Sequence, residues 1–196
     1  MKKLEGVKVG FALTGSHCTI DEVLVELKKV AQEGAVLYPI ISNSVDETDT
    51  RFGASAAWKT RIEEITNQEI ISSIVGAEPV GPEKLFDVLV VVPCTGNTLA
   101  KLANAITDGP VLMATKAHLR NQRPVVIGLS TNDGLSMNAK NIGLLLNAKN
   151  IYMVPFGQDN PAGKPNSLKA RMNLLVETIV CALQSKQIQP VLVAHE

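Results

Sequence analysis

Four short apolar runs lack the alternation of apolar and polar residues that a strand with one wet face requires. They are VKVGFALT (7–14), AVLYPII (35–41), VLVVV (88–92) and PVVIGL (124–129). A strand that is apolar on both sides must be covered on both sides, which is typical of a parallel sheet. Helical patterns separate these runs, so the chain predicts one α/β domain spanning residues 1–196.

The helical patterns vary in strength. Thr19-Ile20-Asp21-Glu22 predicts a capping box, with Thr19 as N-cap of a helix that ends at Gly34. Pro110 predicts the first turn of another helix, which should end near residue 120. Residues 69–86 fit either a short strand or a helical turn. The remaining expectations are helices over 54–66, 97–107, 137–147 and 167–185, and a strand over 151–154.

Charge and composition exclude several functional classes. The 196 residues contain 19 Lys plus Arg and 19 Asp plus Glu, a balance that argues against binding nucleic acid. No apolar run approaches the ~20 residues of a membrane span. The three cysteines, Cys18, Cys94 and Cys181, have no metal-ligand spacing, and their odd number fits a reducing compartment. We therefore expect a soluble cytoplasmic protein without a metal site.

Two polar turns stand where a ligand would bind. Open parallel sheets bind ligands beyond the carboxyl ends of the strands, where the winding direction reverses. The first strand ends in Thr14-Gly15-Ser16-His17-Cys18-Thr19, and the strand expected to be the fourth ends in Pro93-Cys94-Thr95-Gly96-Asn97-Thr98. Hydroxyls, glycine and helix N-termini suit a phosphate without any lysine. Ser and Thr at such turns are also ordinary N-caps, and both interpretations stay open.

Neither turn matches a well-known nucleotide motif. The first has a single glycine and so lacks the G-x-G-x-x-G dinucleotide fingerprint, and no Gly-Lys-Ser/Thr follows either turn.

A family resemblance rests on four segments: the TGS turn, Ser42-Asn43, PCTGNT followed by LAK, and Ser136-Met137-Asn138. Together they resemble the FMN-binding flavoprotein superfamily, which includes cysteine decarboxylases and flavin prenyltransferases. The resemblance implies a Rossmann-like three-layer αβα sandwich with a mainly parallel, doubly wound sheet. It also implies FMN as cofactor, or another phosphate-bearing ligand. The cofactor-binding residues that it implies are Thr14, Gly15, Ser16, Ser42, Asn43, Thr95, Gly96, Asn97, Thr98 and Met137.

TDTRFG, GAEPVGP and PFGQDNP resemble one branch of this superfamily over the full length of the chain. Members of that branch belong to a two-subunit synthase, which implies oxidation of a dihydropyridine diacid to the aromatic diacid during spore formation. The partner subunit would bring NADP, and a hydride acceptor is the main chemical requirement. Two alternatives remain: a non-catalytic scaffold with a nucleotide-like pocket, and a stand-alone FMN-dependent decarboxylase or prenyltransferase.

The chain departs from the decarboxylases in two places. Residues 43–66 contain no histidine where those enzymes carry a catalytic one, and only Met137 and Asn138 remain of their substrate clamp. Cysteine decarboxylation is therefore not expected. Asn97 and Arg51 are the catalytic candidates. The guanidinium of Arg51 suits a diacid or a phosphate, although a solvated loop arginine explains this residue equally well.

Three further features have ordinary explanations beside functional ones. Lys164 could close over a ligand or be a mobile surface lysine, and His17 could move protons or pack locally. Cys18 and Cys94 could be a redox pair or small thiols. The apolar C-terminal PVLVAHE should add an edge strand or dock on a neighbour, which predicts a homo-oligomer.

Overall fold

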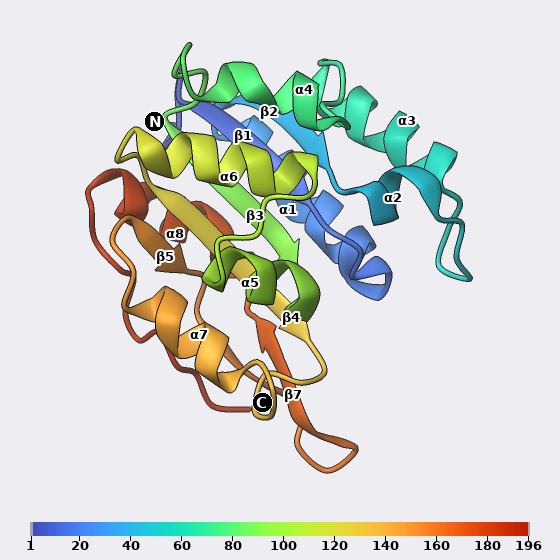
Figure 1. Ribbon diagram of the computed structural model, residues 1–196, viewed down its shortest axis with the longest axis vertical. Helices are drawn as coiled ribbons and strands as arrows, with labels where there is room; N and C mark the ends of the chain where they lie inside the picture. The colour runs from blue at the N-terminus through green and yellow to red at the C-terminus, as the bar shows by residue number, and fades with distance from the viewer. Residues whose placement is uncertain (1, 196) are drawn as a thin grey trace.

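A seven-stranded sheet with helices on both faces makes up the computed structural model, which describes residues 2–195 (Figure 1). The strands are β1 (Lys8–Leu13), β2 (Val36–Ile41), β3 (Val88–Cys94), β4 (Val125–Thr131), β5 (Ile151–Met153), β6 (Phe156–Asn160) and β7 (Lys164–Ala170). The α-helices are α1 (Ile20–Gln32), α2 (Asn43–Glu47), α3 (Ser55–Thr66), α4 (Ile74–Ala77), α5 (Gly96–Ala103), α6 (Pro110–Arg120), α7 (Ala139–Leu146) and α8 (Leu175–Leu183). Three short 3-10 helices are η1 (His17–Thr19), η2 (Glu78–Val80) and η3 (Met172–Leu174).

The strand order is β2-β1-β3-β4-β7-β6, and β5 also pairs with β4. Strands β1 to β5 are parallel, whereas β7 pairs antiparallel with the polar end of β4 at Ser130 and Thr131. Helices α5, α6 and α7 cover one face, and α1 and α8 cover the other (Figure 1). The predicted mainly parallel three-layer sandwich is confirmed.

The winding direction reverses between β1 and β3, which are neighbours in the sheet. The PCTGNT turn therefore follows the third strand along the chain, and its assignment to a fourth strand was wrong. Residues 69–86 hold α4 and η2, with a single bridge between Ile40 and Ile71 instead of a full strand. The ligand edge of the sheet is unaffected, because the two polar turns still follow adjacent strands.

Apolar burial explains why the strands lack alternation. All seven residues of β3 are buried, and in β1 only Lys8 is exposed. On α1 the buried apolar residues recur at helical spacing toward the sheet; they are Ile20, Val23, Leu24, Leu27 and Val30. The rigid core thus ends at the polar turns that follow β1 and β3.

The helix expected over 167–185 was wrong in its first part. Residues 156–170 form the β6–β7 hairpin, and only α8 remains as a regular helix. The chain reverses at 160–163, where the Gly163 N–H donates to the Asn160 side chain at 2.9 Å. Leu168 and Ala170 are buried on one side of β7, with the partly exposed Lys169 between them, and this is strand alternation.

Two helix ends also differ from expectation. Helix α5 ends at Ala103 instead of 107, because the Asn104 side chain donates to the Ala100 carbonyl and Ala105 takes a positive φ of 57°. Thr19 does not cap α1 with its side chain, so the capping box was wrong. Its hydroxyl lies 3.0 Å from the Ser130 hydroxyl instead.

The C-terminal segment makes limited contact with the sheet edge. Leu192 forms one parallel bridge with Phe156, and the Arg171 guanidinium donates to the Ala194 carbonyl at 2.8 Å. The expected edge strand is thus reduced to a bridge. Among residues 2–195, no helix is both long and apolar enough to cross a bilayer.

Candidate functional site

Thr14 joins the two polar turns. Its hydroxyl donates to the Pro93 carbonyl at 2.7 Å and accepts from the Thr95 backbone N–H at 3.0 Å. The side chain is buried, so these bonds are shielded from water. The turns after β1 and β3 are therefore held side by side at the carboxyl edge of the sheet.

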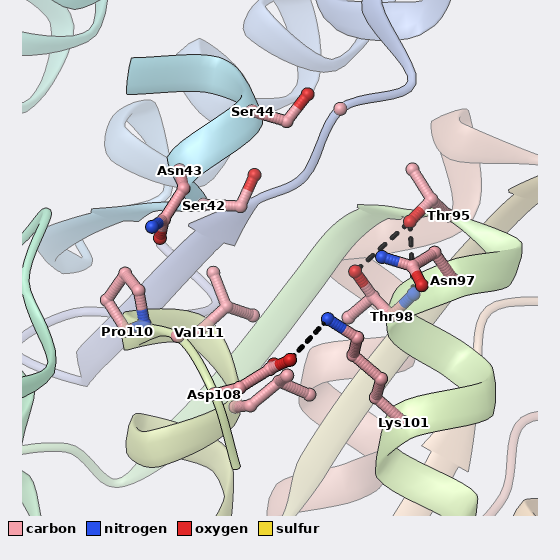
Figure 2. Close-up of a pocket in the computed structure, with 13 residues that line it drawn as sticks. Ser42, Asn43, Ser44, Thr95, Asn97, Thr98, Lys101, Asp108, Pro110 and Val111 are labelled. Carbon is pink, nitrogen blue, oxygen red and sulfur yellow. Dashed lines mark hydrogen bonds and ion pairs between the residues drawn. The ribbon is translucent and has the colours of Figure 1, made fainter. Parts of the chain in front are cut away.

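Cleft one lies beside this junction and encloses about 360 Å³ (Figure 2). Its wall contains the start of α2, the start of α5 and the start of α6. The lining residues are Gly15, Ser42, Asn43, Ser44, Thr95, Asn97, Thr98, Lys101, Asp108, Gly109, Pro110, Val111 and Leu112. The first N–H groups of a helix lack partners within the helix, and the helix dipole adds positive potential there. The N-termini of α5 and α6, which both line this cleft, favour an anion.

One hydroxyl in the wall of cleft one has no protein partner. The Ser42 oxygen is buried and makes no hydrogen bond among the described residues. A buried polar group without a hydrogen-bond partner destabilises the fold, so a ligand atom that pairs with this hydroxyl gains binding free energy. The one lysine in the lining, Lys101, is already paired with Asp108 at 2.6 Å. Uncharged donors and backbone groups therefore dominate this cleft.

Cleft two is larger, about 850 Å³, and lies between the turn after β1 and the β6–β7 hairpin. Its lining residues are Gly15, Ser16, His17, Cys18, Thr19, Thr50, Arg51, Phe52, Thr95, Gly96, Asn97, Ser130, Thr131, Asn132, Asp133, Asp159, Lys164, Ser167 and Lys169. Gly15, Thr95 and Asn97 line both clefts. Molecules bound in the two clefts would therefore meet at these three residues.

Glycine at 96 has a structural explanation. A Cβ added there would lie 2.7 Å from both the Asn138 Nδ2 and the Asp133 Oδ1 and would also collide with the Thr131 hydroxyl. The turn thus packs against residues 131–138, and a larger residue at position 96 would have to displace their hydrogen-bonded side chains. Gly15 is restricted in the same way, because a Cβ there would collide with the Ser44 side chain.

Three titratable groups near the clefts have shifted pKa values. Hydrogen bonds from the Thr131 hydroxyl and the Asn138 amide lower the pKa of Asp133, so this carboxylate stays ionised. Burial lowers the pKa of His17, which favours a neutral ring beside the Ser44 hydroxyl at 3.3 Å. Burial also raises the pKa of the Cys94 thiol to about 12, so this thiol is a poor redox nucleophile.

Most of the residues predicted for the site come together. Cleft one is lined by Ser42, Asn43 and Thr98, and cleft two by Ser16, Gly96 and Arg51. Thr14 lines neither cleft, but its hydrogen bonds join the two turns. Met137 lines neither cleft and is 73% exposed. In this chain it is therefore separated from the predicted set.

Two parts of the cleft walls were not predicted from the sequence. The start of α6 lines cleft one because α6 follows α5 without an intervening strand, and the Gly109-Pro110 helix start was the available signal. The polar end of β4 and Lys169 line cleft two. They were missed because β7 was expected to be helical.

Comparison with known proteins identifies the family. The profile of the Flavoprotein family matches residues 1–183. The B subunit of dipicolinate synthase from Bacillus subtilis (strain 168) is 51% identical over 195 residues, covering 100% of this chain and 98% of that protein. The crystal structure of the B subunit of dipicolinate synthase from Bacillus halodurans is 52% identical, with a TM-score of 0.91 over 98% of this chain and 99% of that one.

A more distant structure shares the fold. The FMN binding protein AtHal3 has a TM-score of 0.65 at 17% identity, covering 94% of this chain and 100% of that one. Three findings support the same family: the profile match over residues 1–183, the full-length relative, and the parallel sheet with its polar turns. The chain is a member of the Flavoprotein family.

Proposed function

We propose that this chain is the B subunit of a dipicolinate synthase and acts as an oxidoreductase together with the A subunit of that enzyme. The observation that carries the proposal is the 51% identity to a protein of that name over the whole chain. The two adjoining clefts support it, because an oxidation needs a cofactor and a substrate held in contact. The proposed setting is the cytoplasm of a spore-forming cell.

FMN is the proposed ligand of cleft one. Its phosphate suits the N-termini of α5 and α6, and the unpartnered Ser42 hydroxyl supplies a donor. Asn43, Thr95 and Thr98 would add further polar contacts from the same walls. When bound, FMN would supply a two-electron relay between the substrate and NADP.

The proposed reaction makes dihydrodipicolinate aromatic. The ring loses a hydride and a proton, the electron pair ends on NADP brought by the partner subunit, and the proton passes to solvent. Aromatisation provides driving force, so the protein must mainly orient the ring and exclude water. Asn97 lines both clefts, and we propose that its amide orients the two molecules against each other.

A homo-oligomer is proposed from the exposed apolar side chains of residues 135–146. Leu135, Met137, Leu144 and Leu146 are between 42% and 73% exposed. Large apolar side chains that are exposed within one short segment favour an interaction surface there.

Cofactor binding separates a catalyst from a scaffold. The purified chain, supplemented with FMN and freed of excess, should retain flavin absorbance and melt at a higher temperature. Inorganic phosphate should raise the melting temperature less, because it lacks the ring. A chain that responds to neither ligand would contradict the cofactor assignment and favour the scaffold alternative.

A further inference from the structure

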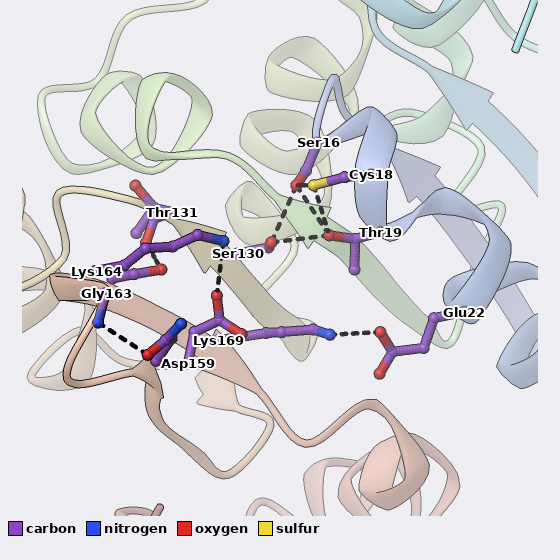
Figure 3. Close-up of polar contacts among 12 residues, drawn as sticks. Ser16, Cys18, Thr19, Glu22, Ser130, Thr131, Asp159, Gly163, Lys164 and Lys169 are labelled. Carbon is purple, nitrogen blue, oxygen red and sulfur yellow. Dashed lines mark hydrogen bonds and ion pairs between the residues drawn. The ribbon is translucent and has the colours of Figure 1, made fainter. Parts of the chain in front are cut away.

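Three hydroxyls on the wall of cleft two bond only to one another and to a thiol. Ser16, Thr19 and Ser130 form a triangle with oxygen separations of 3.1, 3.0 and 3.0 Å (Figure 3). The Cys18 sulfur lies 4.0 Å from Ser16 and 3.7 Å from Thr19. We call Ser16, Thr19 and Ser130 the hydroxyl triangle.

The hydroxyl triangle differs from the buried threonine hydroxyls inside the helices of the protein. Thr66, Thr115 and Thr178 each donate to the backbone carbonyl four residues earlier, at 2.9, 2.7 and 2.7 Å. Within residues 2–195, no member of the triangle donates to a backbone carbonyl. A hydroxyl hydrogen can rotate, so an acceptor in the cleft can recruit one in exchange for a single hydroxyl–hydroxyl bond, with every backbone bond left intact.

Cations face the same cleft from two other segments. Arg51 occupies the tip of a tight turn in which Thr50 and Gly53 exchange backbone hydrogen bonds of 3.0 and 3.1 Å. Its guanidinium carbon lies 4.9 Å from the centre of the Phe52 ring, and no carboxylate partner exists for it among the described residues. A guanidinium offers paired donors that match a carboxylate.

The β6–β7 hairpin supplies the second source of positive charge. Lys164 pairs with Asp159 at 3.2 Å and Lys169 pairs with Glu22 at 2.6 Å (Figure 3). The Lys164 side chain is 56% exposed, and ion pairs of this kind contribute little to stability. Lys164 can therefore exchange Asp159 for an anionic ligand at small cost. Asp133, the other acid in the lining, has both oxygens occupied by Asn138 and Thr131.

We propose that cleft two is the binding site for a small dicarboxylate, with one carboxylate on the hydroxyl triangle and the other on Arg51 and Lys164. The choice of a dicarboxylate rests on the proposed function. The site adjoins cleft one through Gly15, Thr95 and Asn97, so the bound acid lies next to the ligand of that cleft. The β6–β7 hairpin, through Lys164, would then favour a substrate with two negative charges over one with a single charge.

The test is calorimetric titration of the isolated chain with dipicolinate, pyridine-2-carboxylate and inorganic phosphate. Dipicolinate should bind at least tenfold more tightly than either of the others. Arg51→Gln should weaken dipicolinate roughly tenfold to hundredfold, as expected for a charged hydrogen bond. Arg61→Gln is the matched control, because Arg61 pairs with Asp21 outside both clefts. The Arg61→Gln protein should bind dipicolinate as tightly as the wild type does.

A second pair of variants tests the hydroxyl triangle. Thr19→Val removes the hydroxyl at nearly constant shape and should weaken dipicolinate about threefold to tenfold, whereas Thr19→Ser should bind as the wild type does. Thermal melting checks that each variant is folded. Equal affinity for all three anions, or for wild type and Arg51→Gln, overturns the inference. The titration needs neither the partner subunit nor turnover, so it tests this site separately from the proposed function. If the isolated chain does not bind dipicolinate but the mixed subunits still oxidise dihydrodipicolinate, the site is refuted and the proposed function stands.

Discussion

The Thr14 hydroxyl lies 2.7 Å from the Pro93 carbonyl oxygen, a bond between residues 79 positions apart that closes the junction of β1 and β3. The same hydroxyl accepts from the Thr95 N–H. One buried side chain thus fixes the relative position of the two turns that border both clefts. Substitutions at this edge of the sheet should therefore have separable effects on stability and on ligand binding.

Thr14→Val should lower the free energy of unfolding by about 1–3 kcal/mol, because the Thr95 N–H loses its partner and the Pro93 carbonyl keeps only its bond from the Thr14 backbone N–H. FMN binding should weaken as well, since Thr95 loses its anchor. Thr14→Ser keeps the hydroxyl and should preserve both properties. Urea denaturation with FMN titration measures the two effects, and equal stability of Thr14→Val and wild type would contradict the proposed junction.

Ser42→Ala should separate binding from stability. The Ser42 hydroxyl has no protein partner among the described residues, so its removal should leave the unfolding free energy unchanged or slightly higher. FMN affinity should nevertheless fall about threefold to tenfold.

The matched control for Ser42 is Ser73→Ala. The Ser73 hydroxyl accepts from the Gly76 N–H at 3.0 Å and caps α4 away from the clefts. Its loss should cost about 0.5–2 kcal/mol of stability and leave FMN affinity unchanged. If the two variants behave alike in both assays, Ser42 does not contact the ligand.

Gly96→Ala should destabilise the fold by about 1–3 kcal/mol, because the new Cβ meets Asp133, Asn138 and Thr131. Gly143→Ala is the control: the same change inside α7, with nothing within 4 Å of the new Cβ, should stabilise by roughly 0.5–1 kcal/mol. Thermal melting of both variants decides the point. If the Gly96→Ala protein is as stable as the wild type, residues 131–138 can move aside for the new Cβ without loss of stability.

His118 should make the protein sensitive to acid. The ring is fully buried, its Nε2–H donates to the Pro124 carbonyl at 3.1 Å, and burial lowers its pKa from 6.5 to about 4. The unfolded chain binds a proton below pH 6.5, but the folded protein does so only near pH 4. Stability that is present above pH 6.5 is therefore lost as the pH falls toward 4, by roughly 3 kcal/mol.

His118→Gln keeps a donor for Pro124 and cannot be protonated. Its unfolding free energy should fall less than that of the wild type between about pH 7 and pH 4. Denaturant titrations at several pH values compare the two proteins. Parallel pH profiles would show that His118 is not the group responsible.

Local patterns were sufficient for the central strands and their helices. Runs such as 88–92 are apolar throughout because they are buried on both faces, and that requirement is visible in the residues themselves. The β6–β7 hairpin could not be predicted in this way. Its pairing with β4 joins Thr131 to Leu168, and Leu168 also fits the apolar spacing of the helix that follows.

The clefts were predictable only where a strand runs directly into a polar turn. Those turns gave Ser16, Thr95 and Asn97, but the hydroxyl triangle depends on long-range packing. Thr19 matched a capping box locally, yet its hydroxyl bonds to Ser130, 111 residues away. A tertiary partner overrode the local pattern, as it did at the hairpin.

Reconstitution of the proposed synthase from its two subunits tests whether this chain takes part in the oxidation. Oxidation of dihydrodipicolinate is followed by NADPH formation with this chain alone, with only the partner present, and with the two mixed at increasing ratio. We expect little turnover by this chain alone and a rate that rises with added chain until the partner is saturated. Full turnover by this chain alone, or no change in the partner's rate at any ratio, would contradict this expectation.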